Sequence, residues 1–196
     1  MKEIANFLYE LGMLGRLRRQ GPYLAGIKDP ETIAQHSHRA SIIAYILAKM
    51  ENVNVEKTVL MTMFHDVPET RMTDLNKVTR RYFKVKEPEE IIIKEQTQNL
   101  PENIKQSIRS LLDEFNEKES KEAVVARDAD YLECAIQAKE YMEQGTRAMA
   151  DWIKNCEKGV RTNSAKKLIS KIKDTNSIEW WDNLKQLMFE ETENER

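Results

Sequence analysis

The chain has only three histidines, and two of them stand close to acidic residues in apolar surroundings. His65 and Asp66 are adjacent at the end of the segment Val55–Asp66, which is apolar around nearly its whole circumference. An aspartate in such surroundings needs a compensating partner, because burying an unpaired charge costs much free energy. The partner is either a divalent metal ion or, more simply, an arginine or a helix terminus. Glu69 and Asp74 follow closely and complete the pattern HDxxExxxxD.

Two other segments carry residues that would complete a metal site. His36 stands near the start of a predicted helix upstream, and Asp128 and Asp130 stand in a downstream segment that is otherwise apolar. These two aspartates are about 200° apart around a helix, so they cannot both face one ion. Two imidazoles and two carboxylates from three helices suit one divalent ion, with Mn²⁺, Co²⁺, Fe²⁺, Zn²⁺ and Mg²⁺ as candidates.

The order His36, His65-Asp66 and Asp130 resembles the H…HD…D signature of the HD-domain metal-dependent phosphohydrolases. The wider pattern is similar to the YfbR-type 5′-deoxynucleotidases of that superfamily. Its shared parts are a leucine-rich first helix ending in Arg19, PETIAQH before and including His36, HDxxExxxxD, and DYLExxxQAxEY from Asp130. The resemblance extends from Leu11 to Tyr141, and its motifs are specific to the superfamily more than to one substrate.

The resemblance implies a role for each matching residue. The ligands of one divalent ion would be His36, His65, Asp66 and Asp130. Glu69 would be the catalytic carboxylate that activates or orients the attacking water. Asp74 would assist catalysis at the substrate, and Arg19 would bind the phosphate or sugar end of a nucleotide. The family spacing also favours Asp130 over Asp128 as the ligand.

Arg19 and its neighbourhood leave two questions open. Arg19 has no carboxylate nearby in sequence, so it is either an ordinary surface arginine or a phosphate-binding one. The family often has a tryptophan directly after this arginine, where it can pack on the base or sugar. Here the chain reads Arg19-Gln-Gly-Pro-Tyr23, and Tyr23 is the candidate replacement. The base and sugar preference therefore stays open.

The function that the resemblance implies is hydrolysis of (deoxy)nucleoside 5′-monophosphates to nucleoside and phosphate, by a homodimer. One alternative is an HD phosphohydrolase for another phosphoester, such as a cyclic nucleotide, a dNTP or (p)ppGpp. A dNTP or (p)ppGpp enzyme would need more basic residues around the site than the first loop shows. The other alternative is a non-catalytic helical binding module. The presence of all four ligands together with Glu69 argues against it.

Helices must position these residues, because apolar residues recur at helical spacing along the chain and strand-like alternation is absent. Thr32 and Gln35 are expected to form a capping box at the start of one helix, and Ser120 is expected to cap a long helix that stops at Gly145. Thr73 or Asp74 is expected to cap a short helix. The helix over Val55–Asp66 is expected to be central and buried, because it is apolar nearly all round.

These elements predict an all-α bundle of about seven to nine helices. The whole chain, residues 1–196, is expected to form a single HD domain. Its core would span about 11–145, followed by a C-terminal helical extension over about 146–190 that includes a helix at Ser177–Glu190. Four side chains receive simple structural interpretations: His38 at the surface, Cys134 as a small buried hydrophobic residue, and Trp180-Trp181 in the core or at a subunit interface.

The composition excludes several classes of protein. The 31 basic and 33 acidic residues give a net charge of −2, without the basic excess of a nucleic-acid-binding protein. No stretch approaches the roughly 20 apolar residues needed to span a bilayer. The two cysteines cannot form a disulfide framework, which indicates a reducing compartment. We therefore expect a cytoplasmic protein without nucleic-acid or membrane partners.

Overall fold

Apolar residues at helical spacing produce helices along the whole described chain. The computed structural model describes residues 1–182 and 184. In these residues the one extended pairing is an antiparallel bridge between Arg18 and Thr32. The eight helices of at least ten residues are α1 (Lys2–Leu11), α3 (Ile33–Glu51), α4 (Val55–Phe64), α7 (Lys86–Thr97), α8 (Glu102–Glu117), α9 (Lys121–Glu143), α10 (Ala150–Gly159) and α11 (Asn163–Asp174). The prediction of an all-α protein with seven to nine main helices is confirmed.

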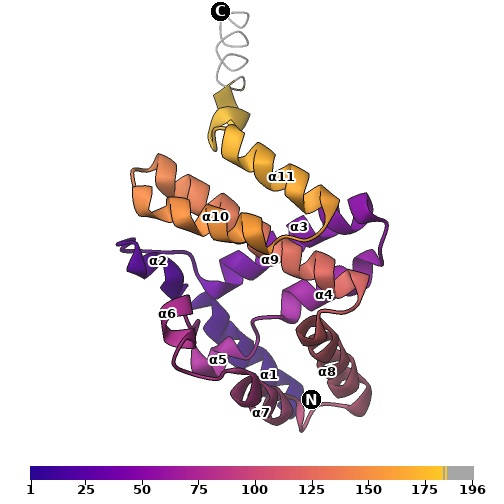
Figure 1. Ribbon diagram of the computed structural model, residues 1–196. Helices are drawn as coiled ribbons and strands as arrows, with labels where there is room; N and C mark the ends of the chain where they lie inside the picture. Colours follow the sequence, from indigo (N-terminus) through magenta and orange to yellow (C-terminus); the bar gives the residue numbers. More distant parts are fainter. Residues whose placement is uncertain (183, 185–196) are drawn as a thin grey trace, which may run out of the picture.

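Short helical segments connect these elements. They are η1 (Gly12–Gly15), α2 (Gln20–Leu24), α5 (Glu69–Met72), α6 (Lys77–Arg80), η2 (Arg147–Met149) and η3 (Glu179–Trp181). Among them, α2, α5 and α6 lie next to one another beside the end of α1 (Figure 1). The side chains that could do chemistry come largely from these short segments and from the long helices that face them.

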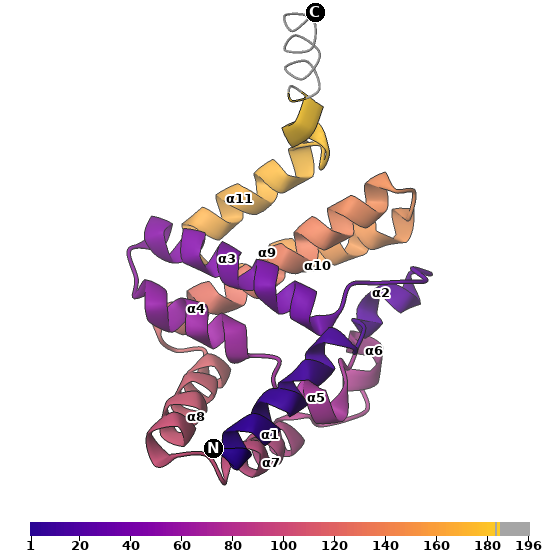
Figure 2. The same cartoon turned by 180° about the vertical axis from the view of Figure 1, so that it is seen from behind.

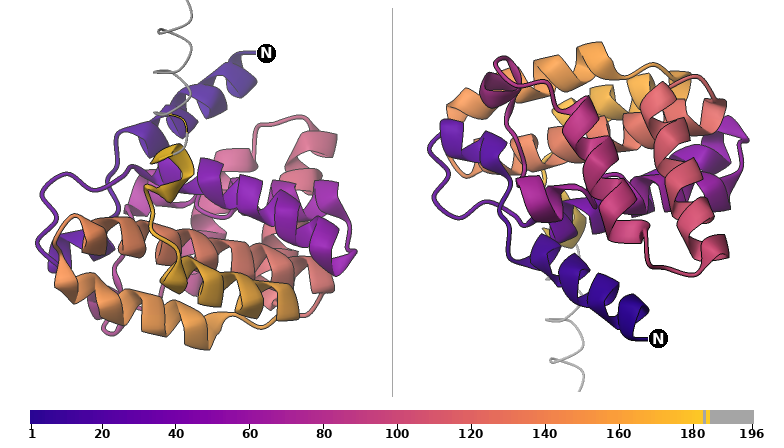
Figure 3. Two further views of the ribbon diagram at one scale, coloured as in Figure 1. Left: turned by 90° about the horizontal axis from the view of Figure 1, so that it is seen from above. Right: turned by 90° about the horizontal axis from the view of Figure 1, so that it is seen from below.

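Helix α9 is the centre of the packing. It contacts α3, α4, α8, α10 and α11, and α3 and α11 lie beside it when the molecule is seen from above (Figure 3). The cluster that joins them contains many small side chains, among them Ala44 and Ala48 of α3 and Ala129 and Ala135 of α9. Small residues at the contact let helix axes approach closely. This close packing brings α3 and α4 against the middle of α9, where Asp130 lies.

A second layer consists of α1, α5, α7 and α8. Figure 2 shows α1 lying across α5 and α7, away from α9. Phe7, Val67, Ile93, Ile108 and Leu112 form the shared core of this layer. The layer fixes the turn between α4 and α5, because Val67 of that turn is buried in it.

The predicted caps are mostly confirmed. Thr32 and Gln35 form the reciprocal capping box, and Ser120 caps α9 by accepting a hydrogen bond from the backbone of Ala123. The predicted cap at Thr73 or Asp74 is wrong. Asn76 caps the short helix α6, and the side chain of Asp74 instead accepts a hydrogen bond from the backbone N–H of Gln20 at 2.6 Å. Asp74 is therefore held toward the first loop.

Helix α4 differs from the expected all-round burial. Met63 is half exposed, whereas Thr58 and Thr62 are completely buried. The two threonine hydroxyls donate to backbone carbonyls one turn earlier, Thr58 to Asn54 and Thr62 to Thr58. The hydrogen bonds remove the cost of burying these polar groups, so polarity alone does not decide which face of α4 lies inside.

The C-terminal part of the chain is only partly described. The predicted helix over Ser177–Glu190 falls mostly outside the described residues, and η3 is what the structure describes of it. Trp180 is 74% exposed, so it does not lie in the core, and a place at a subunit interface stays a prediction. None of the described helices combines the length and the apolar character required to cross a membrane.

Candidate metal centre

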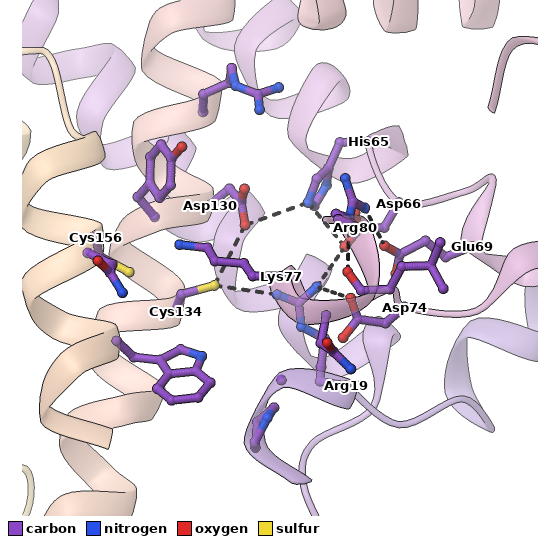
Figure 4. Close-up of a pocket in the computed structure, with 18 of the residues that line it drawn as sticks. Arg19, His65, Asp66, Glu69, Asp74, Lys77, Arg80, Asp130, Cys134 and Cys156 are labelled. Atoms are coloured by element: carbon purple, nitrogen blue, oxygen red, sulfur yellow. Dashed lines mark hydrogen bonds and ion pairs between the residues drawn. The ribbon is translucent and has the colours of Figure 1, made fainter. Parts of the chain in front are cut away.

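Four of the residues selected from the sequence meet at one point. His36 comes from α3, Asp130 from α9, and His65 and Asp66 from the turn that follows α4. The Nε2 atom of His36 lies 3.2 Å from Oδ1 of Asp130 and 3.6 Å from Oδ2 of Asp66. The Nε2 atom of His65 lies 3.1 Å from Oδ2 of Asp66 and 3.9 Å from Oδ1 of Asp130 (Figure 4). The four side chains therefore point their donor atoms at one small volume.

The two imidazoles are oriented by hydrogen bonds on their far sides. The Nδ1–H group of His36 donates to Glu133, and that of His65 donates to the carbonyl of Thr62 at 2.6 Å. In the neutral form of each ring these acceptors keep the proton on Nδ1, so that Nε2 presents a lone pair. Both Nε2 atoms are buried and make no hydrogen bond within the described chain. Two free imidazole nitrogens facing two carboxylates fit a divalent metal ion.

The carboxylates of the cluster are stabilised as anions. Burial alone would raise the pKa of Asp66, but the charges of His65, His36 and Arg19 hold it below its usual value. The pKa of Asp130 is lowered in the same way, against burial, by the nearby imidazoles of His36 and His65 and by Arg19. Both groups therefore remain negative, as ligands of a cation must.

Glu133, which served only as a spacing marker in the sequence, supports the cluster from behind. Its side chain is fully buried and accepts hydrogen bonds from His36 and, at 2.9 Å, from Nε of Arg39. Arg39 also donates to Glu140 at 2.9 Å and to Gln137 at 2.6 Å. The pattern DYLExxxQAxEY thus places three acceptors on one face of α9. They hold Arg39, and Glu133 holds His36.

Glu69 lies beside the cluster with one oxygen unused. It begins α5, its residue is 4% exposed, and its Oε2 atom has no hydrogen-bond partner in the described chain. The other oxygen, Oε1, lies 3.5 Å from Arg80. Burial, followed by the charges of Asp66 and Asp74, raises the pKa of Glu69 well above its usual value. A carboxyl group of raised pKa with a free oxygen can take up or orient the proton of a water molecule.

Arg19 reaches the cluster although it is distant in sequence. Its backbone N–H donates to the carbonyl of Glu31, next to the bridge between Arg18 and Thr32, so the first loop is joined to the start of α3. The guanidinium lies 3.5 Å from Asp66 and 3.8 Å from Asp74. Its side chain is 16% exposed, so the interpretation as a surface arginine is wrong.

Two further predicted positions are resolved by the structure. Asp128 lies outside the cluster, and its carboxylate accepts hydrogen bonds from the backbone N–H groups of Arg161 and Thr162, both at 2.8 Å. Cys134, predicted to be a small buried hydrophobic residue, lies at the site: its Sγ atom accepts a hydrogen bond from Nη2 of Arg19 at 3.4 Å. The histidine interpreted as a surface residue, His38, is exposed.

The cluster opens into a cavity of about 620 Å³. One wall comes from α9 and α10 and carries Gln137, Trp152 and Asn155. Tyr23, the candidate replacement for the family tryptophan, is not among the described residues that line this cavity, and 41% of it is exposed. Three of the described aromatic residues line the cavity, Phe115, Tyr131 and Trp152, and Trp152 is the one on α10. Its Nε1 atom would lie 3.4 Å from a Cβ added at Gly21, so the indole edge packs on the first loop.

The fold is a helical bundle, and its cluster is a candidate site for a divalent metal ion. Residues 11–173, which are most of the chain, match the HD domain family, and the chain belongs to that family. The family prediction made from the sequence is confirmed.

Individual relatives agree with this assignment. The bovine 5′-deoxynucleotidase HDDC2 is 29% identical over 143 residues, which cover 71% of this chain and 68% of the bovine protein. A solved conserved hypothetical protein from Pyrococcus furiosus is 26% identical with a TM-score of 0.73, and the match covers 87% of this chain and 99% of that one. A solved protein of Magnetospirillum magnetotacticum, described as a predicted metal-dependent phosphohydrolase, shares the fold with a TM-score of 0.68 at 21% identity, over 88% of this chain and 90% of that one.

Proposed function

We propose that this protein is a metal-dependent phosphohydrolase that releases phosphate from deoxynucleoside 5′-monophosphates. The observation that carries the proposal is the pair of buried Nε2 atoms, on His36 and His65, that face Asp66 and Asp130 without hydrogen bonds. Relatives named 5′-deoxynucleotidase over about 70% of the chain support the choice of substrate.

In this proposal His36, His65, Asp66 and Asp130 hold one divalent metal ion, for which Mn²⁺, Co²⁺, Fe²⁺, Zn²⁺ and Mg²⁺ are the candidates. When bound, such an ion lowers the pKa of water and polarises a phosphoryl oxygen. Glu133 keeps the proton of His36 on Nδ1, so that Nε2 stays available as a ligand.

The remaining side chains act on the water and the phosphoryl group. Glu69 accepts a hydrogen bond from the attacking water at its unused Oε2 and takes up its proton. Arg19 offers its fork of N–H groups to the phosphoryl oxygens, where positive charge stabilises the transition state. Asp74 keeps Arg19 in place, with 3.8 Å between them, and lines the cavity at the substrate.

The wall formed by α9 and α10 suits a nucleoside. Trp152 offers an aromatic surface on which a base or sugar can stack, and the amides of Gln137 and Asn155 can donate and accept hydrogen bonds. In this proposal Trp152 does the work that the family tryptophan does elsewhere, from a helix far along the chain.

The pair Trp152→Ala and Tyr23→Ala tests this placement. Because base stacking on an aromatic ring contributes about 1–3 kcal/mol, we expect Trp152→Ala to raise the KM for dAMP by about tenfold. Hydrolysis of 2-deoxyribose 5-phosphate, which has no base, should change little. Tyr23→Ala should behave like the wild type with both substrates. Equal effects of the two substitutions in steady-state assays would contradict the role of Trp152.

The function itself is tested with a substrate panel. Purified protein is stripped with a chelator, reloaded with each candidate ion in turn, and assayed for phosphate release from deoxy- and ribonucleoside 5′-monophosphates. A cyclic nucleotide, a dNTP and (p)ppGpp complete the panel, with chromatography to identify products. We expect metal-dependent release from the deoxynucleotides. Turnover that is absent from every metal form, or confined to another phosphoester, would contradict the proposal.

The assembly and location of the protein also belong to this proposal. The outer face of α3 exposes Ile42, Tyr45, Ile46 and Met50, which lie at helical spacing and are each about half exposed. An apolar stripe of this kind is typical of an interface, and it supports a homodimer. Light scattering coupled to gel filtration measures the mass that tests it. We further propose that residues 1–196 form a single HD domain in the cytoplasm, which the pair of unbridged cysteines supports.

A further inference from the structure

The cavity extends beyond the metal centre in two directions along α9. Arg127, Asp130, Cys134 and Gln137 all line it from one face of this helix. With a rise of 1.5 Å per residue, Arg127 and Gln137 are about 15 Å apart along the axis, with Asp130 between them. Trp152 packs on the cluster that contains Ala138, so it lies at the Gln137 end. A monophosphate that binds at Asp130 and stacks on Trp152 leaves the Arg127 end unfilled.

The unfilled end carries cations from three helices. Arg127 comes from α9, Lys118 follows α8 directly as its C-cap residue, and Lys86 begins α7. All three line the same cavity as the metal centre. The guanidinium of Arg127 lies over the ring of Phe115, 4.8 Å from its centroid, and that ring lies 5.4 Å from the ring of His65. Phe115 thus packs between Arg127 and His65, which is a proposed metal ligand.

Two of these cations, Arg127 and Lys118, lack a counter-charge of their own within the described chain, whereas Lys86 lies 3.8 Å from Glu90. Among the described residues, no carboxylate lies within ion-pair distance of Arg127 or Lys118, whereas Arg19, Arg39 and Arg71 each have one. The charge of Arg127 is the main cause that lowers the pKa of Lys118, ahead of burial. Glu89 also lines the cavity; it lies 3.8 Å from Arg80, and from beyond ion-pair distance its charge partly offsets those of Arg127 and Lys118. Two neighbouring cations that repel each other favour an anion between them.

We propose that Arg127 and Lys118, with Lys86 at the rim, form a second anion site for a phosphoryl group joined to the one at the metal centre. The ligand class is the nucleoside 5′-diphosphates and 5′-triphosphates. This inference rests on the proposed function, because it takes the first phosphoryl group to lie at the metal centre and the nucleoside to lie against Trp152. The next phosphoryl group then extends along α9 toward Arg127.

Binding measurements on a variant without turnover test the site. In a Glu69→Gln background, loaded with metal, dAMP and dADP are titrated by isothermal calorimetry. A charge-assisted contact of the second phosphoryl group predicts that dADP binds about tenfold more tightly than dAMP. Arg127→Gln and Lys118→Gln should each remove most of this advantage and leave the Kd for dAMP within about twofold. Lys121→Gln, on an exposed residue of the same helix α9 that does not line the cavity, should leave both values unchanged.

Four results would overturn the proposal. The first is a Kd for dADP no lower than that for dAMP, and the second is an equal loss of affinity for both nucleotides in Arg127→Gln. The third is a loss of dADP affinity in Lys121→Gln as large as that in Arg127→Gln. The fourth is binding of free inorganic phosphate beside dAMP without tighter binding of dADP. Should Arg127→Gln unfold because it leaves Phe115, Lys118→Gln carries the same comparison. Phosphate release from dAMP by the wild type is measured separately. It tests the proposed function, so the two can fail independently.

Discussion

Asp128 and Asp130 lie two positions apart in the most central helix, α9, on different faces, and different groups surround their carboxylates. Asp128 is 1% exposed, and its oxygens accept three hydrogen bonds from Arg161 and Thr162, so its charge is satisfied by the chain itself. Asp130 faces two imidazole nitrogens that make no hydrogen bonds. A buried carboxylate is structural when backbone donors surround it. It is available for a ligand when lone pairs surround it.

The largest effect is expected from Asp130→Ala. Removing one of four proposed ligands should abolish stoichiometric metal binding and reduce phosphate release to background, because the remaining donors form an incomplete set. Elemental analysis and a phosphate assay measure the two outcomes, and circular dichroism checks the fold. Full metal content in this variant would show that Asp130 is not a metal ligand.

A smaller loss of activity is expected from Glu69→Ala. This side chain is placed beside the cluster as an acid–base group, so the metal should be retained while turnover falls by about two orders of magnitude or more. Measuring metal content and kcat on the same sample separates the roles. A variant that has lost its metal would make Glu69 a ligand.

Glu133→Gln is expected to act more weakly and through the metal. The amide cannot hold the His36 proton as strongly, so metal affinity should fall by about 10- to 100-fold, the scale found for groups that orient ligands. Activity should recover when excess metal is added. A loss of activity that excess metal does not restore would argue that Glu133 has a different role.

Asp128→Ala should leave the activity of each folded molecule unchanged. It deprives the backbone donors of Arg161 and Thr162 of their acceptor, so the free energy of unfolding should decrease by about 2–3 kcal/mol. Urea denaturation and metal analysis together measure this outcome. Reduced metal content in the folded fraction would contradict the distinction between a structural Asp128 and a metal-binding Asp130.

Much of the fold could be predicted because its signals are local. The capping box at Thr32 and the cap at Ser120 lie within one turn of the residues that they serve, and helical spacing requires no knowledge of the partner helix. The cap at Thr73 or Asp74 was wrong for the opposite reason. The side chain of Asp74 instead accepts a hydrogen bond from the backbone of Gln20, more than fifty positions away, and sequence spacing does not reveal such a contact.

The residues of the site likewise fall into a group that is close in sequence and a group that only tertiary packing brings together. His65, Asp66 and Glu69 share one turn, so their proximity follows from the sequence. The partners of Arg19 could not be found, because Asp66 and Cys134 reach it only through tertiary packing. Trp152 was missed for the same reason, since α10 follows the part of the chain that carries the motif. The basic residues that the first loop lacked come instead from α7, α8 and α9 around the cavity.

The convergence of α3, α4 and α9 on one point also has a thermodynamic consequence. A metal ion held by His36, His65, Asp66 and Asp130 would tie together segments that are far apart in the chain, and the unfolded chain offers no such preformed site. Binding would therefore be linked to folding. An ion at a hundred times its dissociation constant would add about 2.7 kcal/mol to the stability of the native state. The melting temperature of this protein should then rise with metal concentration, and the centre of the bundle would work as a reversible cross-link.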